Sequence, residues 1–177
     1  MRRVPGIVLV FAVLFFAQVV RADSVFTAML NGAQEPTTST ATGFGTVILN
    51  ATQTMITVDE SFSGLIGGPA TASHIHCCAA PGANGPVLFP FAGVPNATSG
   101  TIPEQTFAIT PAEVAELEAG LMYMNIHDAV FPGGEIRGQI VAATTPEPGS
   151  LLLLALGLFV MLLCAPRMRR LHAASQA

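Results

Sequence analysis

Hydrophobic and polar residues alternate along several short stretches in the middle of the chain, and turns rich in glycine and proline separate these stretches. A period of two is typical of β-strands that have one buried face. Strands at this spacing, without alternating helices, indicate an all-β domain, either an antiparallel β-sandwich or a Greek-key barrel. The eight predicted strands are Val25–Leu30, Gly43–Leu49, Met55–Phe62, Ala72–Cys77, Val87–Phe91, Thr106–Ile109, Leu121–His127 and Glu135–Val141.

One short helix is predicted after Thr110. This hydroxyl residue is followed by Pro111 and, three positions on, by Glu113, which together predict an N-cap, a first-turn proline and a capping box. Gly120 can end the helix. We interpret the glutamates of this segment as helix-stabilising rather than catalytic, because carboxylates are favoured near the positive end of the helix dipole.

The N-terminal segment, residues 1–22, has the pattern of a secretory signal peptide. Arg2 and Arg3 precede an uninterrupted apolar run, and small residues surround a predicted cleavage point before Asp23. The alternative is an uncleaved membrane anchor, although the apolar run is shorter than the ~20 residues of a spanning helix.

A second apolar run lies near the other end of the chain and predicts a transmembrane helix within residues 146–170. The motif Pro146, Glu147, Pro148 precedes this run, and Arg167, Arg169 and Arg170 follow it. Arginines beside a membrane helix stay in the cytoplasm, so residues 171–177 are expected to be a cytoplasmic tail and the β domain to lie outside.

The segment between the two apolar ends, residues 23–145, is strongly acidic. It holds ten of the eleven carboxylate residues of the chain, and Arg137 is its only lysine or arginine, because the chain contains no lysine and the other six arginines lie outside this segment. Such a segment cannot make the phosphate contacts on which nucleic-acid binding depends, and this class of partner is therefore excluded.

Three of the four histidines fall in two predicted strands. Because side chains alternate along a strand, His74 and His76 share one face, and His127 shares a face with Tyr123 and Asn125. If the strands are neighbours, the three imidazoles can converge as ligands of copper or zinc. Asp128 or Glu135 could then orient a histidine ring. The alternative is a polar sheet face that is exposed to solvent and binds no metal.

Cys77 and Cys78 follow the histidine pair directly. Export into an oxidising compartment permits a disulfide between them. They could instead be soft metal ligands, or they could stay reduced as small buried residues. Cys164 belongs to the C-terminal apolar run and is not expected to pair with them.

The order of Pro146-Glu147-Pro148, an apolar helix and an arginine cluster resembles the bacterial PEP-CTERM sorting signal. The resemblance implies export, transient anchoring in the inner membrane and processing by an exosortase near the Pro-Glu-Pro motif. It also implies a destination in the cell envelope or outside the cell.

Several motifs of the middle segment resemble, in the same order, the chordin-type (CHRD) domain. The resemblance covers roughly residues 23–143 and implies a compact β-rich binding domain, without an established enzymatic activity. This chain has Cys77-Cys78 where Gly-Pro is common in the family. The motifs are Phe26–Glu35, Thr42–Val47, Phe62–Leu65, Ala72–His76, Gly85–Val87, Tyr123–His127 and Pro132–Gln139.

Two functions follow from these observations. The first is an exported, transiently anchored envelope or matrix protein whose non-enzymatic β domain binds an unidentified extracellular ligand. The alternative is an exported copper- or zinc-binding protein that uses His74, His76 and His127 and could be redox-active. The His-x-His pair is similar to the copper strand of copper/zinc superoxide dismutases, but this likeness rests on fold class and one pair, and function does not transfer with fold. A hydrolase is disfavoured because Ser73 lies in no Gly-x-Ser-x-Gly elbow.

Overall fold

A computed structural model describes residues 21–143 and 156–159 of the chain. All eight predicted strands are present in the first of these ranges, together with the predicted helix and a short 3-10 helix. In chain order the elements are β1 (Ser24–Asn31), η1 (Gly32–Gln34), β2 (Thr42–Leu49), β3 (Met55–Ser63), β4 (Ala70–His76), β5 (Val87–Pro90), β6 (Gly100–Ala108), α1 (Pro111–Glu118), β7 (Tyr123–Asp128) and β8 (Ile136–Ala142).

Only β6 differs much from its predicted bounds, because it begins at Gly100 rather than at Thr106. It pairs with β3 along nearly its whole length and forms one edge of the sheet. Pro103 lies within it, and an edge strand tolerates proline because one row of its N–H groups needs no partner strand.

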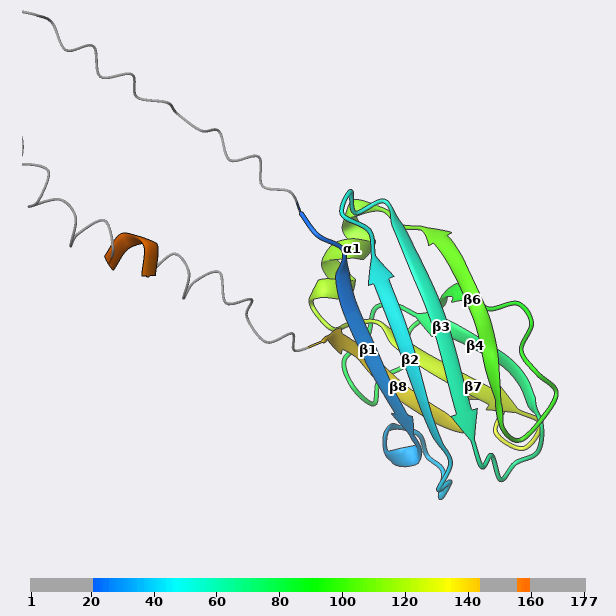
Figure 1. Cartoon of the computed structure of the whole chain (residues 1–177). Helices are drawn as coiled ribbons and strands as arrows, with labels where there is room; N and C mark the ends of the chain where they lie inside the picture. The colour runs from blue at the N-terminus through cyan, green and yellow to red at the C-terminus, as the bar shows by residue number, and fades with distance from the viewer. Residues whose placement is uncertain (1–20, 144–155, 160–177) are drawn as a thin grey trace, which may run out of the picture. The chain divides into compact units, whose positions relative to one another are not determined.

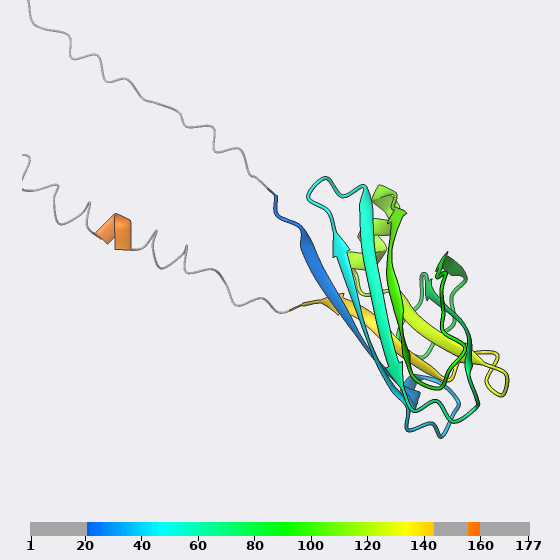
Figure 2. The same cartoon turned by 45° about the vertical axis from the view of Figure 1, so that its right-hand side comes forward.

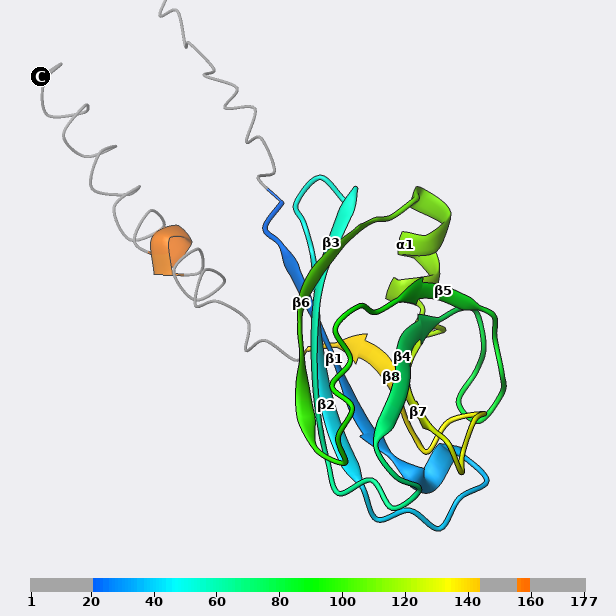
Figure 3. The same cartoon turned by 90° about the vertical axis from the view of Figure 1, so that its right-hand side faces the viewer.

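The strands form one antiparallel sheet in the order β5-β4-β7-β8-β1-β2-β3-β6. Figures 1 and 2 show that this sheet curls over, and in Figure 3 β1, β2, β3 and β6 form one wall while β4, β5, β7 and β8 form the other. The two edge strands meet through side chains, since the rings of Phe89 and Phe107 lie 5.2 Å apart. Gln105 also exchanges two hydrogen bonds with the backbone of Ala92. The expectation of a sandwich or barrel is therefore met by a nearly closed, barrel-like sheet.

The hydrophobic core lies inside this curled sheet and follows the predicted alternation. Inward positions of both walls are almost fully buried, and large aliphatic side chains from the two walls pack together, as expected when each strand presents one apolar face. They include Leu30, Val47, Ile56, Val58, Ile75, Met124, Ile126, Ile136 and Ile140.

The outer face of β4 and β7 is polar, as predicted, and it continues onto β8, but it is not a solvent-facing surface. Tyr123, Asn125 and Arg137 on this face are each about as buried as the core, with 1% of their surface exposed. The segment after η1 and the loops at residues 79–86 and 129–134 pack over them and hydrogen-bond to them. The expected solvent exposure of this face is therefore wrong for Tyr123, Asn125 and Arg137, because loops form a second layer over them, whereas His74 and His127 are only partly buried.

Helix α1 has the capping box that the sequence predicts. The Thr110 hydroxyl accepts a hydrogen bond from the Glu113 amide, and the Glu113 carboxylate accepts one from the Thr110 amide. Gly120 follows the helix with a φ of 69°, a conformation that favours glycine. Val114 and Leu117 are buried against the sheet, so the helix covers one end of the barrel.

Within residues 21–143 and 156–159, no helix has both the length and the apolar character needed to cross a membrane. The predicted signal peptide up to residue 20, the Pro146-Glu147-Pro148 motif, the arginine cluster and nearly all of the predicted transmembrane helix lie outside the described residues. Close contacts divide the chain into two units after Ala142.

Candidate metal centre

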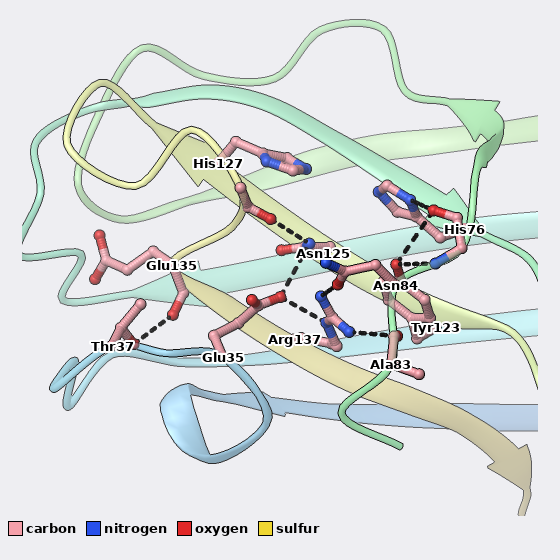
Figure 4. Close-up of polar contacts among 12 residues, drawn as sticks. Glu35, Thr37, His76, Ala83, Asn84, Tyr123, Asn125, His127, Glu135 and Arg137 are labelled. Atoms are coloured by element: carbon pink, nitrogen blue, oxygen red, sulfur yellow. Dashed lines mark hydrogen bonds and ion pairs between the residues drawn. The ribbon is translucent and has the colours of Figure 1, made fainter. Parts of the chain in front are cut away.

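The three predicted histidines come together on the covered outer face of the sheet. β4 and β7 are antiparallel neighbours, and their register places His74 opposite Asn125 and His76 opposite Tyr123. One ligand nitrogen from each of His74, His76 and His127 can be chosen so that all three lie within 4.8 Å of one another. Zinc–nitrogen bonds of about 2.0–2.1 Å place two ligands of one ion at most about 4.2 Å apart, so small side-chain movements would bring all three nitrogens onto a single ion. Figure 4 shows the rings of His76 and His127 on the same side of the strands.

Backbone carbonyls fix the orientation of two of the rings. Nδ1 of His76 lies 3.0 Å from the carbonyl oxygen of Gly85, and Nδ1 of His127 lies 3.0 Å from that of Pro132. Because a carbonyl only accepts, each Nδ1 carries the proton and each Nε2 keeps its lone pair. A histidine that ligates a metal commonly donates its other N–H to such a carbonyl.

The Nε2 lone pairs of His76 and His127 have different surroundings. Nε2 of His76 is buried and has no hydrogen-bond partner among the described residues. Nε2 of His127 lies 3.2 Å from Nδ1 of His74 and accepts a hydrogen bond from it. A metal would replace this hydrogen bond, and His74 would move its proton to Nε2 without a change of charge.

Burial keeps all three imidazoles neutral. Desolvation lowers the pKa of His74, and the neighbouring His76 lowers it further. Desolvation also lowers the pKa of His76, with Arg137 adding to it and the Gly85 carbonyl opposing it. Desolvation lowers the pKa of His127 to about 4. The Pro132 carbonyl opposes this shift, whereas His74, His76 and Arg137 add to it. Neutral imidazole is the form that binds a metal.

A buried arginine for which no role was predicted from the sequence organises the surroundings of these rings. Arg137 donates to the Glu35 carboxylate, to the Ala83 carbonyl oxygen at 2.8 Å and to Asn84 Oδ1 at 2.6 Å. Figure 4 shows its guanidinium between Glu35 and the loop of Ala83 and Asn84. The fork-shaped guanidinium thus joins the segment after η1 to the loop over β7. The sequence contained one signal for this role, since Arg137 is the only base among ten acids.

Tyr123 connects this arginine to the histidine site. Its ring stacks on His76 with centroids 4.7 Å apart and planes 4° apart, and Arg137 lies 4.2 Å from the centroid of the same ring. The Tyr123 hydroxyl accepts a hydrogen bond from the Gly85 amide at 3.0 Å. The side chain that packs on His76 is therefore itself held by the loop and by a cation.

The expectation that Asp128 or Glu135 orients a histidine ring is wrong. Glu135 precedes β8, and its carboxylate accepts hydrogen bonds from Ser39 and from the amides of Ile66 and Gly67. Asp128 accepts from the amides of Val130 and Phe131 in its own loop. Both carboxyl groups fix loops, whereas backbone carbonyls orient the rings.

Cys77 and Cys78 form a vicinal disulfide at the end of β4. Cys77 is buried and Cys78 is exposed. In this bonded state neither sulfur has a thiolate with which to bind a metal.

The interior holds one functional group that the sequence analysis missed. Glu60 is fully buried in β3, and its carboxyl group lies 2.5 Å from the hydroxyl of Ser73 in β4. Its position in the alternation is the signal that could have found it, because Glu60 shares a face with Val58 and Phe62. Ser73 points into the core, away from His74, so the two do not form a nucleophile–base pair.

Comparisons with known proteins bear on both parts of the chain. Residues 26–140 match the family model of the CHRD domain. Residues 144–170 match that of the PEP-CTERM protein-sorting motif. No curated protein and no solved structure matches the chain.

Proposed function

Because the chain belongs to the CHRD domain family and carries a PEP-CTERM sorting motif, we propose that it is an exported, non-enzymatic metal-binding protein whose β domain holds one copper or zinc ion with His74, His76 and His127. The sorting motif marks a protein that passes through the membrane to the cell envelope or the extracellular space, and that is processed by an exosortase. The domain's binding partner there, other than the metal, stays a prediction.

The convergence of three neutral imidazoles carries this proposal. The buried Nε2 of His76 has no partner, and leaving a polar atom in that state costs free energy that a metal bond would recover. The donor set is nitrogen only, which suits copper and zinc better than the oxygen-preferring calcium and magnesium. Three protein ligands also leave a coordination position for water or another small ligand.

Metal analysis of the purified full chain tests this function. The protein in a mild detergent is equilibrated with Cu²⁺ or Zn²⁺ and desalted, and its metal content is measured by mass spectrometry. We expect about one ion per wild-type chain and a large loss in His74→Ala and His127→Ala. His172→Ala is the matched control, since this histidine lies outside the CHRD match. Wild-type protein without metal, or equal metal in His127→Ala, overturns the proposal.

We further propose that the mature protein spans roughly residues 23–145, after removal of residues 1–22 and of the sorting segment 146–170 with its tail. The support is the apolar segments at both ends and the match to the sorting motif. Replacing Pro146, Glu147 and Pro148 by alanine should leave the C-terminal segment attached in an exosortase-competent host. Intact mass measurement of wild type and variant checks this, and identical processing of both contradicts it.

A further inference from the structure

The vicinal disulfide lies next to the histidine site along the chain. Cys77 directly follows His76, the last residue of β4. The Cys77 amide donates to the carbonyl oxygen of Pro86 at 3.0 Å, which ties the disulfide to the start of β5. The bonded pair closes a small covalent ring that includes the peptide between the two residues, so the backbone at this point has little freedom.

Gly85 connects the disulfide with the histidine site. A Cβ atom at Gly85 would lie 2.3 Å from the carbonyl oxygen of Cys77 and 2.9 Å from the amide nitrogen of Cys78, so the two backbones are in direct contact. The same glycine accepts the Nδ1 proton of His76 and donates its amide hydrogen to Tyr123, which stacks on His76. Gly85 thus contacts the backbone of the disulfide, supplies the carbonyl that orients His76 and donates a hydrogen bond to Tyr123.

We propose that the Cys77–Cys78 pair is a redox-responsive site that regulates metal binding at the three histidines, through the contact of both cysteines with Gly85. The inference rests on the proposed metal-binding function. In the oxidised protein the ring holds the backbone against which Gly85 packs. Reduction opens the ring, Gly85 loses this fixed support, and the carbonyl that orients His76 becomes less well placed.

Reduction of the Cys77–Cys78 disulfide requires a reductant that contains two thiols, such as an exported dithiol protein or dithiothreitol. One thiolate of the reductant attacks the sulfur of Cys78, the exposed residue of the pair, forms a mixed disulfide and releases the Cys77 thiolate. The second thiolate of the reductant then attacks the mixed disulfide and releases the Cys78 thiolate. Two electrons pass from the reductant, which becomes a disulfide, and its two protons end on Cys77 and Cys78. The exposure of Cys78 permits the first attack.

The size of the effect follows from the role of the Gly85 carbonyl. Loss of a group that holds a metal-ligating histidine costs about 10- to 100-fold in metal affinity. Because reduction loosens this group rather than removing it, we expect about a tenfold loss. This decrease in metal affinity is the opposite of the increase that we would expect if the reduced thiols themselves became metal ligands.

Zinc titration of the full chain in detergent tests the inference, since Zn²⁺ takes no part in redox chemistry. All proteins carry Cys164→Ser, so that only the vicinal pair can react. Three samples are compared: the oxidised protein, the same protein reduced and freed of reductant under nitrogen, and the double variant Cys77→Ala/Cys78→Ala. We expect the second and third to bind Zn²⁺ about tenfold more weakly than the first. We also expect the double variant not to respond to reductant. Equal affinity in the three samples, or tighter binding after reduction, overturns the inference.

A measurement without metal separates this inference from the proposed function. The Gly85 amide donates a hydrogen bond to the Tyr123 hydroxyl, and its hydrogen exchange should become faster when the metal-free protein is reduced. In the double variant the reductant should not change this exchange rate. If oxidised protein binds no metal while this exchange still responds to reduction, the metal-binding function fails and the link between the disulfide and Gly85 stands. If zinc binds and neither affinity nor exchange responds to reduction, only the redox inference fails.

Discussion

The carboxyl group of Glu60 and the hydroxyl of Ser73 meet inside the barrel, where each residue is fully buried. Ser73 Oγ also lies 3.1 Å from the carbonyl oxygen of Asn125. A serine hydroxyl has one hydrogen, so it cannot donate to both a carboxylate and a carbonyl. A protonated Glu60 resolves this, because its O–H donates to Ser73 and Ser73 donates to Asn125. Desolvation favours the same state, and it raises the pKa of Glu60 to about 8 against the Ser73 hydrogen bond.

Glu60 should therefore make the stability of the β domain depend on pH. The pKa of Glu60 is about 8 in the folded protein and 4.5 for an unperturbed glutamate, so unfolding between these pH values releases a proton. The stabilisation is complete below pH 4.5 and is lost as the pH rises to about 8. In Glu60→Gln this dependence is absent, and the variant should gain on wild type by up to about 1.4 kcal/mol per pH unit in that window.

Urea unfolding at several pH values measures this difference. Glu104→Gln, which removes an exposed carboxylate from β6, is the control for a general effect of charge. A Glu60→Gln curve that runs parallel to wild type between pH 5 and 8 would show that Glu60 is not protonated in the folded protein.

The fold was largely predictable because strand alternation and turn residues are local signals. The capping box at Thr110 and Glu113 is set within one turn of helix, and the face shared by His74 and His76 follows from their spacing alone. The convergence of His127 with this pair depends on β4 and β7 being neighbours in the sheet, and from the sequence this could only be assumed.

Tertiary contacts decided the features that the sequence did not predict. The polar face is covered because Arg137 reaches Glu35 and Ala83, residues 102 and 54 positions away along the chain. The partners of His76 and His127 are backbone carbonyls of loops, and such atoms have no residue-specific signature. Their assignment to Asp128 and Glu135 failed for this reason.

Tyr123 should separate the effect of a stacked ring from that of a hydroxyl. Tyr123→Phe keeps the surface that packs on His76 and leaves the Gly85 amide without its partner, at a cost of about 1 kcal/mol in stability. Its zinc affinity should stay close to that of wild type. Tyr123→Leu removes the flat ring, and we expect about tenfold weaker zinc binding because His76 is less well oriented. Zinc titration beside urea unfolding checks both, and equal affinity of the Phe and Leu variants would contradict a role for the stack.

The buried ion pair of Arg137 and Glu35 should be essential to the covered face. Arg137→Gln leaves a buried carboxylate without its cation, and such losses cost about 3–5 kcal/mol. Arg21→Gln is the matched control, because Arg21 lies 3.7 Å from Glu118 with 57% of its side chain exposed. An exposed pair of this kind contributes about 0–1 kcal/mol.

The double variant Glu35→Gln/Arg137→Gln should recover part of the loss, since it removes the unpaired charge. Unfolding free energies of the two single variants and the double variant give the coupling directly. Losses that simply add would show that the pair does not act as a unit, and a small loss in Arg137→Gln would show that the loop at Ala83 and Asn84 does not depend on the guanidinium.

Gly138 should be intolerant of any side chain, because β8 approaches the backbone of β1 at this point. A Cβ atom there would lie 2.5 Å from the carbonyl oxygen of Met29 and 3.0 Å from the amide nitrogen of Leu30. These are backbone atoms of a paired strand and cannot rotate away as a side chain can. We expect Gly138→Ala to cost about 1–3 kcal/mol, as overpacking of a tight contact does.

Gly133→Ala is the matched control for this position, since no atom lies within 4 Å of its Cβ site. Gly138 stands between Arg137 and Gln139, which both face the covered side of the sheet, so a shift of β8 would also move the guanidinium that packs on Tyr123. Gly138→Ala should therefore weaken zinc binding as well as stability, whereas Gly133→Ala should change neither. Equal unfolding midpoints of the two alanine variants would mean that β1 and β8 are not held this closely together.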